Sequence, residues 1–375
     1  MTTSIPIPGT SKTLGGDDVF VIAEIGKNFI ETEAEQPIET YLANAKKLID
    51  AAIASGADAV KFQTHVVEDE QLDIKVVSPH FKGADRYSWI SRNERSTPFD
   101  AFWWPIKAYC DEKSILFFST PMSRGAAEKI MPLDPLLWKV SSGDIFDDVL
   151  LDALIAKGKP IIMSTGMTSL AELDTRVAEL TGRGATLAIL YCVSQYPCPH
   201  EAFNLATIEL FKEKYPDIPI GFSDHSVDGH EVDLAAIKLG ARILEKHFSF
   251  SRELWGADHK SSITPAEMKA MVEAIRAKEY ESVDTASFYG TKDRELEGAE
   301  SQFRPYFNKS LVAGRDLPAG TVIEKDMVYA MRPRMYAGPM PSEKFYEVLG
   351  KRLVAPLKKC EPLTEENLAG LRPLR

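Results

Sequence analysis

Short apolar runs and longer amphipathic stretches alternate along most of the chain. The apolar runs are rich in β-branched residues and lie at 19–26, 59–64, 115–120, 136–142, 160–166, 187–194, 218–225 and 241–248. Nearly continuous apolar runs of this length are typical of parallel strands that are covered on both faces. Eight such strands, spread over about 260 residues, predict a (β/α)8 TIM barrel in the α/β class. A doubly wound open sheet is the structural alternative, but eight regular units favour closure.

Helical periodicity occupies the intervals between these runs. Amphipathic stretches lie at 41–55, 150–158 and 231–240, and the last two end in Gly, which is a helix C-cap signal. A further helix is expected over 265–280, with Thr264 as its N-cap. Each expected strand is thus followed by a candidate helix, as a barrel requires.

The chain changes character after the last expected barrel helix. Residues 283–304 are polar and lack apolar periodicity, so we expect a linker there. Residues 305–375 contain short apolar runs interrupted by Pro and Gly, which is typical of a small β-rich module. The predicted organisation is therefore an N-terminal extension (1–18), a barrel domain (19–282), the linker and the β-rich module.

Composition and charge exclude several classes of protein. The chain carries 44 Lys and Arg against 55 Asp and Glu, a net charge of −11, which argues against a general nucleic-acid binder because phosphate contacts need a basic face. No apolar run approaches the ~20 residues that cross a membrane, and residues 1–16 lack the pattern of a signal peptide. The four cysteines match no zinc or redox spacing. We expect a cytoplasmic protein with reduced thiols.

The expected strands end in residues that are capable of chemistry, and in a barrel these carboxyl ends build the active site. A lysine inside an apolar strand is costly unless it is paired, so packing alone does not explain the pattern. The residues at or just beyond the strand ends include Glu24, Lys61, Gln63, Thr120, Lys139, Ser142, Asp144, Ser164, Ser194, Tyr196, Ser223, His225, Glu245, Lys246 and His247.

Two groups of these residues suggest two kinds of site. His225 and His247 end adjacent strands, where two imidazoles could hold one divalent metal and leave positions open for water and substrate. Alternatively, each is a hydrogen-bonded histidine at the barrel mouth. The second group combines two ammonium groups with hydroxyls, as a phosphate site does. It consists of Lys61, Lys139, Ser142, Ser164, Ser194 and Ser223. The lysines could instead pair with carboxylates such as Glu24 or Asp144, or one of them could form a Schiff base.

Signals away from the strand ends are weaker. The interval from His65 to Thr97 is longer than ~15 residues and has no clear periodicity, which favours a functional lid. It carries Lys82, Arg86, Arg92 and Arg95, which could meet an anion or remain solvated loop charges.

A series of short motifs runs along the chain in a fixed order. In the barrel they are AEIG (23–26), VKFQTHVVEDE (60–70), STP (119–121), KVSSGD (139–144), STGM (164–167), YP (196–197), SDH (223–225), EKHF (245–248) and GADHKSS (256–262). As an ordered set they resemble the sialic acid synthases, the family of N-acetylneuraminate synthase and its legionaminic and pseudaminic acid relatives. The later segments SLVAGRDLPAGTVI, MRP and VLGKRLVAPLKKCEPLTEENL resemble the SAF, or antifreeze-like, domain of the same family.

The resemblance implies a reaction and a set of site residues. The reaction is the condensation of phosphoenolpyruvate with N-acetylmannosamine or a related acetamido sugar, which gives a nine-carbon 2-keto-3-deoxy acid and phosphate. The phosphoenolpyruvate site would comprise the two lysines and four serines named above, with Asp144 also in substrate binding. The sugar and reaction-centre side would comprise Glu24, Gln63, Thr120, Tyr196 and Asp258.

The resemblance also implies a cofactor and a partner. His225 and His247 would hold Mn²⁺ or Mg²⁺, which polarises the aldehyde oxygen as a Lewis acid. Arg332, in the MRP motif, would reach the active site of a partner subunit in a domain-swapped homodimer. A Schiff-base pyruvate aldolase and a non-catalytic sugar-binding protein remain the alternative functions.

The sequence departs from the family pattern in three places. Where the family follows AEIG with one residue and then Asn-His-x-Gly, this chain reads Lys27-Asn28-Phe29-Ile30. The Arg-Pro-Gly of the family reads Arg-Pro-Arg at 332–334, and the asparagine expected near Lys82 is not obvious. All three departures fall near the sugar end, so the resemblance indicates the type of reaction more firmly than the identity of the sugar.

Overall fold

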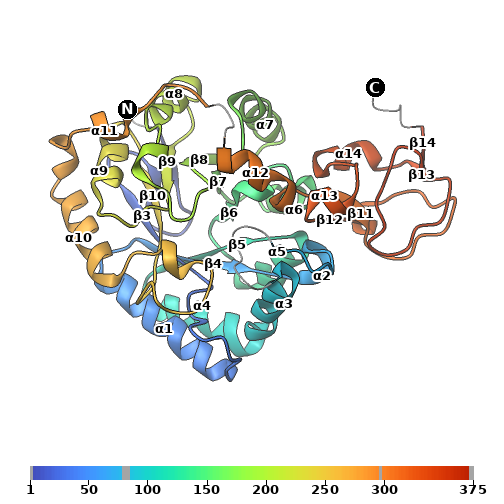
Figure 1. Cartoon of the computed structure of the whole chain (residues 1–375), viewed down its shortest axis with the longest axis horizontal. Helices are drawn as coiled ribbons and strands as arrows, with labels where there is room; N and C mark the ends of the chain where they lie inside the picture. The colour runs from blue at the N-terminus through green and yellow to red at the C-terminus, as the bar shows by residue number, and fades with distance from the viewer. Residues whose placement is uncertain (1–2, 78–84, 295–297, 371–375) are drawn as a thin grey trace.

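The computed structural model describes residues 3–77, 85–294 and 298–370. Lys82 of the expected lid lies outside them. Eight parallel strands form one sheet in the order β5-β4-β3-β10-β9-β8-β7-β6, and its two end strands, β5 and β6, contact each other. The sheet is therefore the predicted barrel (Figure 1). Its strands are β3 (Phe20–Gly26), β4 (Ala59–Thr64), β5 (Leu116–Pro121), β6 (Trp138–Val140), β7 (Ile161–Ser164), β8 (Leu187–Cys192), β9 (Ile220–Asp224) and β10 (Ile243–His247).

Helices surround the barrel and cover the outer faces of its strands (Figure 1). They are α1 (Ile38–Ala54), α2 (Val67–Glu70), α3 (Arg86–Ser96), α4 (Trp104–Glu112), α5 (Arg124–Ile130), α6 (Asp148–Ile155), α7 (Leu170–Gly182), α8 (Ala206–Lys214), α9 (Glu231–Lys238) and α10 (Pro265–Arg276). The predicted start of α10 is confirmed, because Thr264 and Glu267 form a capping box in which each side chain accepts a hydrogen bond from the other residue's main-chain N–H.

Apolar side chains fill the lower half of the barrel interior. Inward-facing residues near the strand starts, such as Phe20, Ile22 and Ile162, form one buried cluster. An N-terminal hairpin of β1 (Ser4–Pro6) and β2 (Thr13–Gly15) adds Ile7 and Leu14 to that cluster. The hairpin therefore closes the amino end of the barrel.

The predicted linker is held against the barrel. It contains α11 (Ala286–Tyr289), and α12 (Gly298–Phe307) begins near its end. Between them, the buried guanidinium of Arg294 donates hydrogen bonds to the main-chain carbonyls of Thr165 (2.6 Å) and Cys192 (3.1 Å). This part of the chain is thus anchored to the ends of β7 and β8, whereas its polarity alone suggested a free spacer. The domain boundaries themselves stay predictions.

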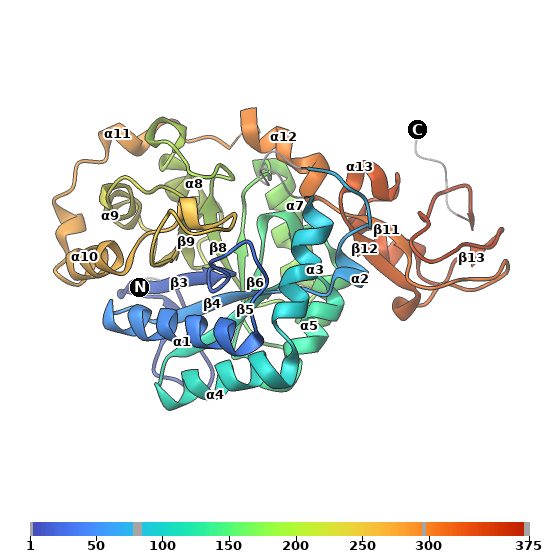
Figure 2. The same ribbon diagram turned by 60° about the horizontal axis from the view of Figure 1, so that its bottom comes forward.

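The C-terminal module consists of short elements around a small core. Two antiparallel pairs join β11 (Ser310–Ala313) to β12 (Val328–Met331) and β13 (Arg352–Leu353) to β14 (Leu368–Ala369). Two one-turn helices, α13 (Arg334–Ala337) and α14 (Phe345–Val348), complete it. Val149 of α6 belongs to the core of the module, and α2 contacts β12. The module therefore packs on the barrel of its own chain (Figure 2).

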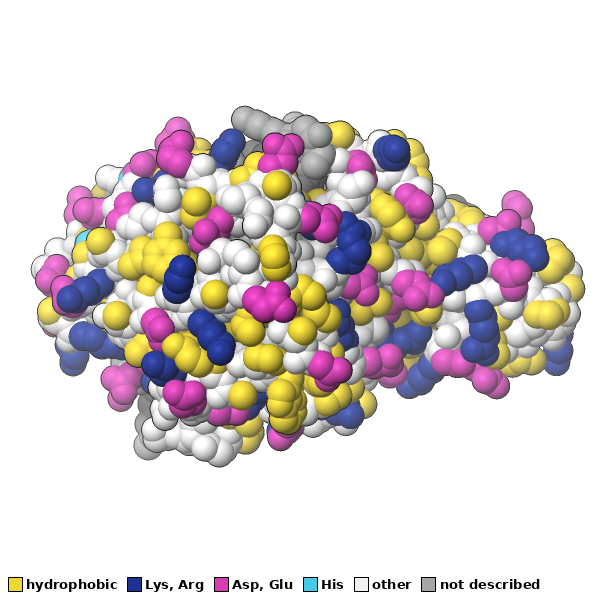
Figure 3. Space-filling view, turned by 90° about the horizontal axis from the view of Figure 1, so that it is seen from below, with side chains coloured by type: hydrophobic (Ala, Val, Ile, Leu, Met, Phe, Trp, Pro, Cys, Tyr) yellow, Lys and Arg dark blue, Asp and Glu magenta, His cyan; other side chains and the backbone are white. Residues whose placement is uncertain are grey.

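Charged and apolar side chains are distributed over the described residues as follows. On the face shown in Figure 3, acidic and basic side chains are interspersed, and no extended basic patch appears. Among the helices of the described residues, none has the length and apolar character that a bilayer crossing needs.

Candidate active site

A cavity opens at the carboxyl ends of the barrel strands and encloses about 880 Å³, including the space at its mouth. All the residues that the sequence assigned to the site line this cavity except Asp144. They are Glu24, Lys61, Gln63, Thr120, Lys139, Ser142, Ser164, Ser194, Tyr196, Ser223, His225, His247, Asp258 and Arg332. A volume of this size is in the range of small-molecule sites.

The alternation of side chains along each strand explains how these residues meet. On β3, Glu24 shares a face with Phe20 and Ile22, which lie in the inner apolar cluster. On β7, Ser164 likewise shares the inward face with Ile162 of the same apolar cluster. Each inward face is therefore apolar at the bottom of the barrel and polar at the mouth.

Lys61 stands in a buried network of carboxylates. Its Nζ lies 2.6 Å from Oε2 of Glu24 and 3.7 Å from Oε2 of Glu245, and it donates to Oγ1 of Thr120 at 3.1 Å. Burial acts to lower the pKa of Lys61, but the two carboxylates outweigh it and raise that pKa above its usual value. Lys61 therefore forms the ion pair with Glu24 that the sequence left open as an alternative. Both residues also line the cavity.

Lys139 lies across the cavity and is more weakly paired. It donates to Oγ of Ser164 at 2.6 Å and to the carbonyl of Val140 at 3.1 Å, whereas Oε1 of Glu245 is 3.8 Å away. Burial lowers the pKa of Lys139, and the attraction of Glu245 opposes this only in part. An anion that replaced the distant carboxylate would stabilise the charged form of Lys139.

A glycine opens space beside these groups. The main-chain N–H of Gly166 donates to Oγ of Ser142 at 3.0 Å. A Cβ on Gly166 would lie 2.1 Å from Oγ of Ser194 and 2.7 Å from Oγ of Ser142, so only glycine permits the two hydroxyls to approach the backbone here. Hydroxyls, a main-chain N–H and an ammonium group converge as they do in phosphate sites.

His247 ends β10 and His225 directly follows β9, the adjacent strand, and the centroids of the two rings are 5.5 Å apart. Nδ1 of His225 lies 2.9 Å from the carbonyl of Val193; because a carbonyl only accepts, this nitrogen carries the proton and leaves Nε2 as the acceptor. Nδ1 of His247 has no hydrogen-bond partner among the described residues. Burial lowers the pKa of each histidine to about 4, so both are neutral at pH 7.

Neutral imidazoles with free nitrogen lone pairs are good metal ligands. Within the described ranges, no cluster of three or more His, Cys, Asp or Glu residues forms a metal site. Two neutral imidazoles that line one cavity, His225 and His247, are donors that fit a divalent ion whose other ligands would come from substrate and water.

The structure adds cavity residues that the sequence left unassigned. Glu245, which links the two lysines, shares the inner face of β10 with His247, so the alternation of that strand could have identified it. Lys27 follows β3 directly, and Phe303 and Phe307 come from α12. No local pattern marked the two phenylalanines, because they lie in or just after the polar stretch predicted as linker.

In this single chain, Arg332 enters the cavity from the C-terminal module; the domain-swapped active site that the resemblance implies involves a second chain and stays a prediction. Its main-chain N–H donates to the carbonyl of Glu70 at 2.9 Å, and its guanidinium pairs with Asp144. The arrangement is anchored by Lys309, whose fully buried Nζ lies 2.9 Å from Asp144 and 2.7 Å from Asp147. Homodimerisation itself stays a prediction.

Asp144 is placed differently from its predicted role. It does not line the cavity; its carboxylate lies behind the wall and pairs with Arg332 and Lys309. Asp144 therefore positions a cavity residue instead of contacting a ligand there.

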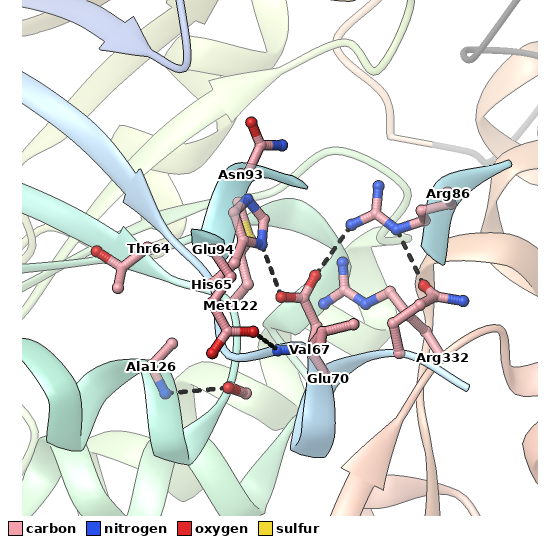
Figure 4. Close-up of polar contacts among 12 residues, drawn as sticks. Thr64, His65, Val67, Glu70, Arg86, Asn93, Glu94, Met122, Ala126 and Arg332 are labelled. Carbon is pink, nitrogen blue, oxygen red and sulfur yellow. Dashed lines mark hydrogen bonds and ion pairs between the residues drawn. The ribbon is translucent and has the colours of Figure 1, made fainter. Parts of the chain in front are cut away.

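The described part of the expected lid includes helices α2 and α3, and it places Arg86 at the cavity. Arg86, the first residue of α3, lines the cavity and donates to Glu70 (3.2 Å) and Gln71 (3.1 Å). Glu70 also contacts Nδ1 of His65 at 2.7 Å, so this carboxylate joins the two side chains (Figure 4). Arg92 instead donates to main-chain carbonyls of residues 32–34, and Arg95 forms an exposed pair with Glu35.

Comparison with known proteins gives matches over nearly the whole chain. The NeuB family model matches residues 48–285, and the SAF domain model matches residues 308–369. The spore coat polysaccharide biosynthesis protein SpsE of Bacillus subtilis is 31% identical over 90% of both chains. Its crystal structure superposes with a TM-score of 0.80 at 28% identity, covering 99% of this chain and 100% of that chain.

Two further relatives have names that state a product. A pseudaminic acid synthase of Campylobacter jejuni is 31% identical over 92% of this chain and 96% of its own. The human N-acetylneuraminate-9-phosphate synthase is 28% identical over 94% of this chain and 93% of its own.

Proposed function

The chain belongs to the NeuB family, and from that premise we propose that it condenses phosphoenolpyruvate with an acetamido sugar to give a 2-keto-3-deoxy sugar acid and phosphate. Relatives named as synthases of N-acetylneuraminate 9-phosphate, pseudaminic acid and N,N'-diacetyllegionaminic acid support the reaction type. The observation that carries the proposal is the single cavity in which a lysine–serine pocket adjoins two neutral histidines.

The lysine–serine pocket binds phosphoenolpyruvate in this proposal. The anionic groups of phosphoenolpyruvate pair with Lys139, which lies 3.8 Å from the carboxylate of Glu245, and they accept hydrogen bonds from the nearby serines. Lys61 remains charged before substrate arrives because Glu24 and Glu245 raise its pKa. A charge-assisted contact of this kind contributes about 1.5–3 kcal/mol.

His225 and His247 would hold Mn²⁺ or Mg²⁺ beside this pocket. When bound, the ion supplies Lewis-acid polarisation of the sugar aldehyde. The protein fixes the direction of His225 through the Val193 carbonyl, and the ring of Tyr196, whose centroid is 4.0 Å from that of His225, packs against it. These contacts hold the ligand nitrogen toward the cavity.

The condensation needs one proton to be delivered and one to be removed. C3 of phosphoenolpyruvate forms the new bond to the aldehyde carbon, water adds to C2, and phosphate leaves as its bond to C2 breaks. The aldehyde oxygen gains one proton, and the attacking water loses one as it adds to C2. As the C2 hydroxyl becomes the keto group, its remaining proton leaves with the phosphate. Burial raises the pKa of Glu24, although Lys61 opposes this, so Glu24 is suited to hold a proton between these two steps.

A phosphate-release assay tests the proposal. Purified protein is incubated with phosphoenolpyruvate, Mn²⁺ and each of a panel of acetamido sugars, and phosphate and the keto acid are measured. We expect release that requires both substrates, and no covalent adduct when pyruvate and borohydride are added instead. Absence of release with every sugar contradicts the proposal, and a borohydride-trapped lysine would assign a Schiff-base aldolase.

A further inference from the structure

We propose that Arg294 is a positioning residue for the phosphate pocket, and that it acts by orienting the peptide group between Thr165 and Gly166. The inference rests on the proposed function, since it concerns the pocket that binds phosphoenolpyruvate there. Arg294 lies in the stretch that the sequence predicts as a linker, and it does not line the cavity. Its effect on an anion in the cavity therefore passes through other groups.

The guanidinium of Arg294 is buried against the carboxyl ends of two barrel strands, and the residue is only 6% exposed. It donates to the main-chain carbonyls of Thr165 at 2.6 Å, Cys192 at 3.1 Å and Thr168 at 3.2 Å. Hydrogen bonds from a charged donor are stronger than those between neutral groups. Arg294 therefore fixes the direction of three peptide carbonyls where β7 and β8 end.

The peptide group that follows Thr165 has a second contact on its opposite side. This peptide bond is trans, and in a trans peptide the C=O and N–H bonds point in opposite directions. The carbonyl of Thr165 faces Arg294, so the N–H of Gly166 points away from Arg294. That N–H donates to Oγ of Ser142 at 3.0 Å, and Ser142 lines the cavity. One peptide group thus connects the buried cation to a hydroxyl of the pocket.

This connection prepares Ser142 to bind an anion. A phosphate dianion only accepts hydrogen bonds, so a serine that binds it must donate its proton. Because Oγ of Ser142 already accepts from Gly166, its own proton goes to another acceptor. In the structure that acceptor is Sγ of Cys192, at 3.8 Å, and a sulfur atom is a weak acceptor. An oxygen of phosphate would take the proton instead, and the chain of hydrogen bonds that begins at the guanidinium would strengthen this contact.

The turn that Arg294 holds contains a residue in an unfavourable conformation. Met167 has a φ of 58°, in the left-handed region that residues with a side chain rarely adopt. The guanidinium contacts the carbonyls of Thr165 and Thr168, which lie on both sides of Met167. Such a conformation persists only where the surroundings enforce it. Without the guanidinium we therefore expect the turn to relax and Gly166 to lose its hydrogen bond to the pocket serine.

A second arginine near the end of the same stretch provides a matched control. Arg304 of α12 donates to the carboxylate of Glu172 on α7 at 2.7 Å and 3.3 Å. It also ties this stretch to the barrel, but through a side chain instead of the main chain beside the pocket. Replacing Arg304 thus removes an equal charge without removing a donor from the carbonyls of the turn.

The test measures the affinity of full-length protein for two anions. Calorimetry gives the dissociation constant of inorganic phosphate, and keto acid formation gives the KM for phosphoenolpyruvate. We expect both values to rise about tenfold in Arg294→Ala, as for the loss of one charge-assisted hydrogen bond, with little change in the KM for the sugar. Arg294→Lys, whose single nitrogen cannot span three carbonyls, should lose about threefold. Arg304→Ala should match the wild type. Guanidinium ion, added below the concentration that unfolds the protein, should restore phosphate binding to Arg294→Ala.

A double-mutant cycle with Ser142→Ala separates positioning from stability. If Arg294 acts through Ser142, Arg294→Ala combined with Ser142→Ala should bind phosphate no more weakly than Ser142→Ala alone. Additive losses would overturn the inference, and so would a lower urea midpoint with unchanged phosphate affinity. Should Arg294→Ala fail to fold, the same cycle with Arg294→Lys decides, and wild-type affinity in Arg294→Lys would count against the inference. Phosphate binding needs no turnover, so these results hold even if no sugar is converted. A wild type that binds neither anion would refute the proposed function as well.

Discussion

Replacing Lys139 by methionine removes one charge from the proposed phosphate pocket and retains most of the side-chain volume. In the structure this ammonium donates to Ser164 and lies 3.8 Å from Glu245. Glu245 keeps two partners in the variant, because Lys61 lies 3.7 Å from it and Ser223 donates to it at 3.1 Å. We therefore expect the protein to fold and the main loss to fall on phosphoenolpyruvate.

The size of that loss follows from the contact that is removed. A charge-assisted hydrogen bond contributes about 1.5–3 kcal/mol, which corresponds to a roughly ten- to hundredfold weaker affinity for phosphoenolpyruvate. The affinity should also depend on pH. Because burial lowers the pKa of Lys139, its charge is lost at a lower pH than that of an exposed lysine. The wild-type kcat/KM for phosphoenolpyruvate should fall as pH rises through that pKa, and Lys139→Met should lack this decline.

Lys246 provides the matched control. It is also buried and also lies near the end of a barrel strand, but it faces away from the cavity and pairs with Asp224 and Asp233. Lys246→Met should lower the free energy of unfolding by about 3–5 kcal/mol, because it leaves buried carboxylates without their cation. In protein that folds, it should leave the KM for phosphoenolpyruvate unchanged.

The assay combines keto acid formation over a range of phosphoenolpyruvate concentrations with calorimetric binding and urea denaturation. A normal KM and turnover in Lys139→Met, together with a large loss of stability, would refute the reasoning. Lys139 would then be a structural ion-pair residue, and the phosphate pocket would have to lie elsewhere.

Lys309→Met should lower the free energy of unfolding by about 3–5 kcal/mol, since it removes one of two cations from a buried cluster and leaves Asp147 without its ion pair; an unchanged urea midpoint would show that this lysine does not anchor the module. A mixture of Arg332→Ala and His225→Ala, prepared so that any subunits exchange, should stay inactive if Arg332 acts in the cavity that it lines within its own chain. Recovery of activity would demonstrate a swapped arrangement. EDTA should abolish keto acid formation and Mn²⁺ should restore it, and His247→Ala should bind less metal by elemental analysis. Full activity of metal-free protein would contradict the metal assignment.

The barrel was predictable because its strands are buried on both faces and therefore show as continuous apolar runs. The run at 59–64 coincides with β4, and the other strands lie within one to two residues of their expected starts. The strand expected at 136–142 is shorter, Trp138–Val140. Its C-terminal residues instead enter a 3₁₀ turn at Ser142–Asp144, where Ser141 donates to the carboxylate of Asp144 at 2.6 Å.

Tertiary contacts account for what the sequence could not indicate. The polarity of residues 283–304 suggested a spacer, but Arg294 ties this stretch to main-chain carbonyls that no local pattern reveals. The position of Arg332 depends on the burial of Lys309 beside Asp144 and Asp147, a contact between residues far apart in the chain. Lys27 was visible as a departure from the family pattern, but its ion pair with Asp258 joins residues far apart in the chain and has no local signal.

The N-terminal hairpin has a consequence for the active site that it does not touch. By adding Ile7 and Leu14 to the apolar cluster inside the barrel, it keeps water out of the region directly beneath Lys61 and Glu245. The ion pairs above that region therefore act in a medium of low dielectric constant, where charges attract one another more strongly than at a wetted surface. Deletion of residues 1–16 would thus admit solvent below the pocket and weaken the attraction between its charged groups. Every cavity side chain would still be present.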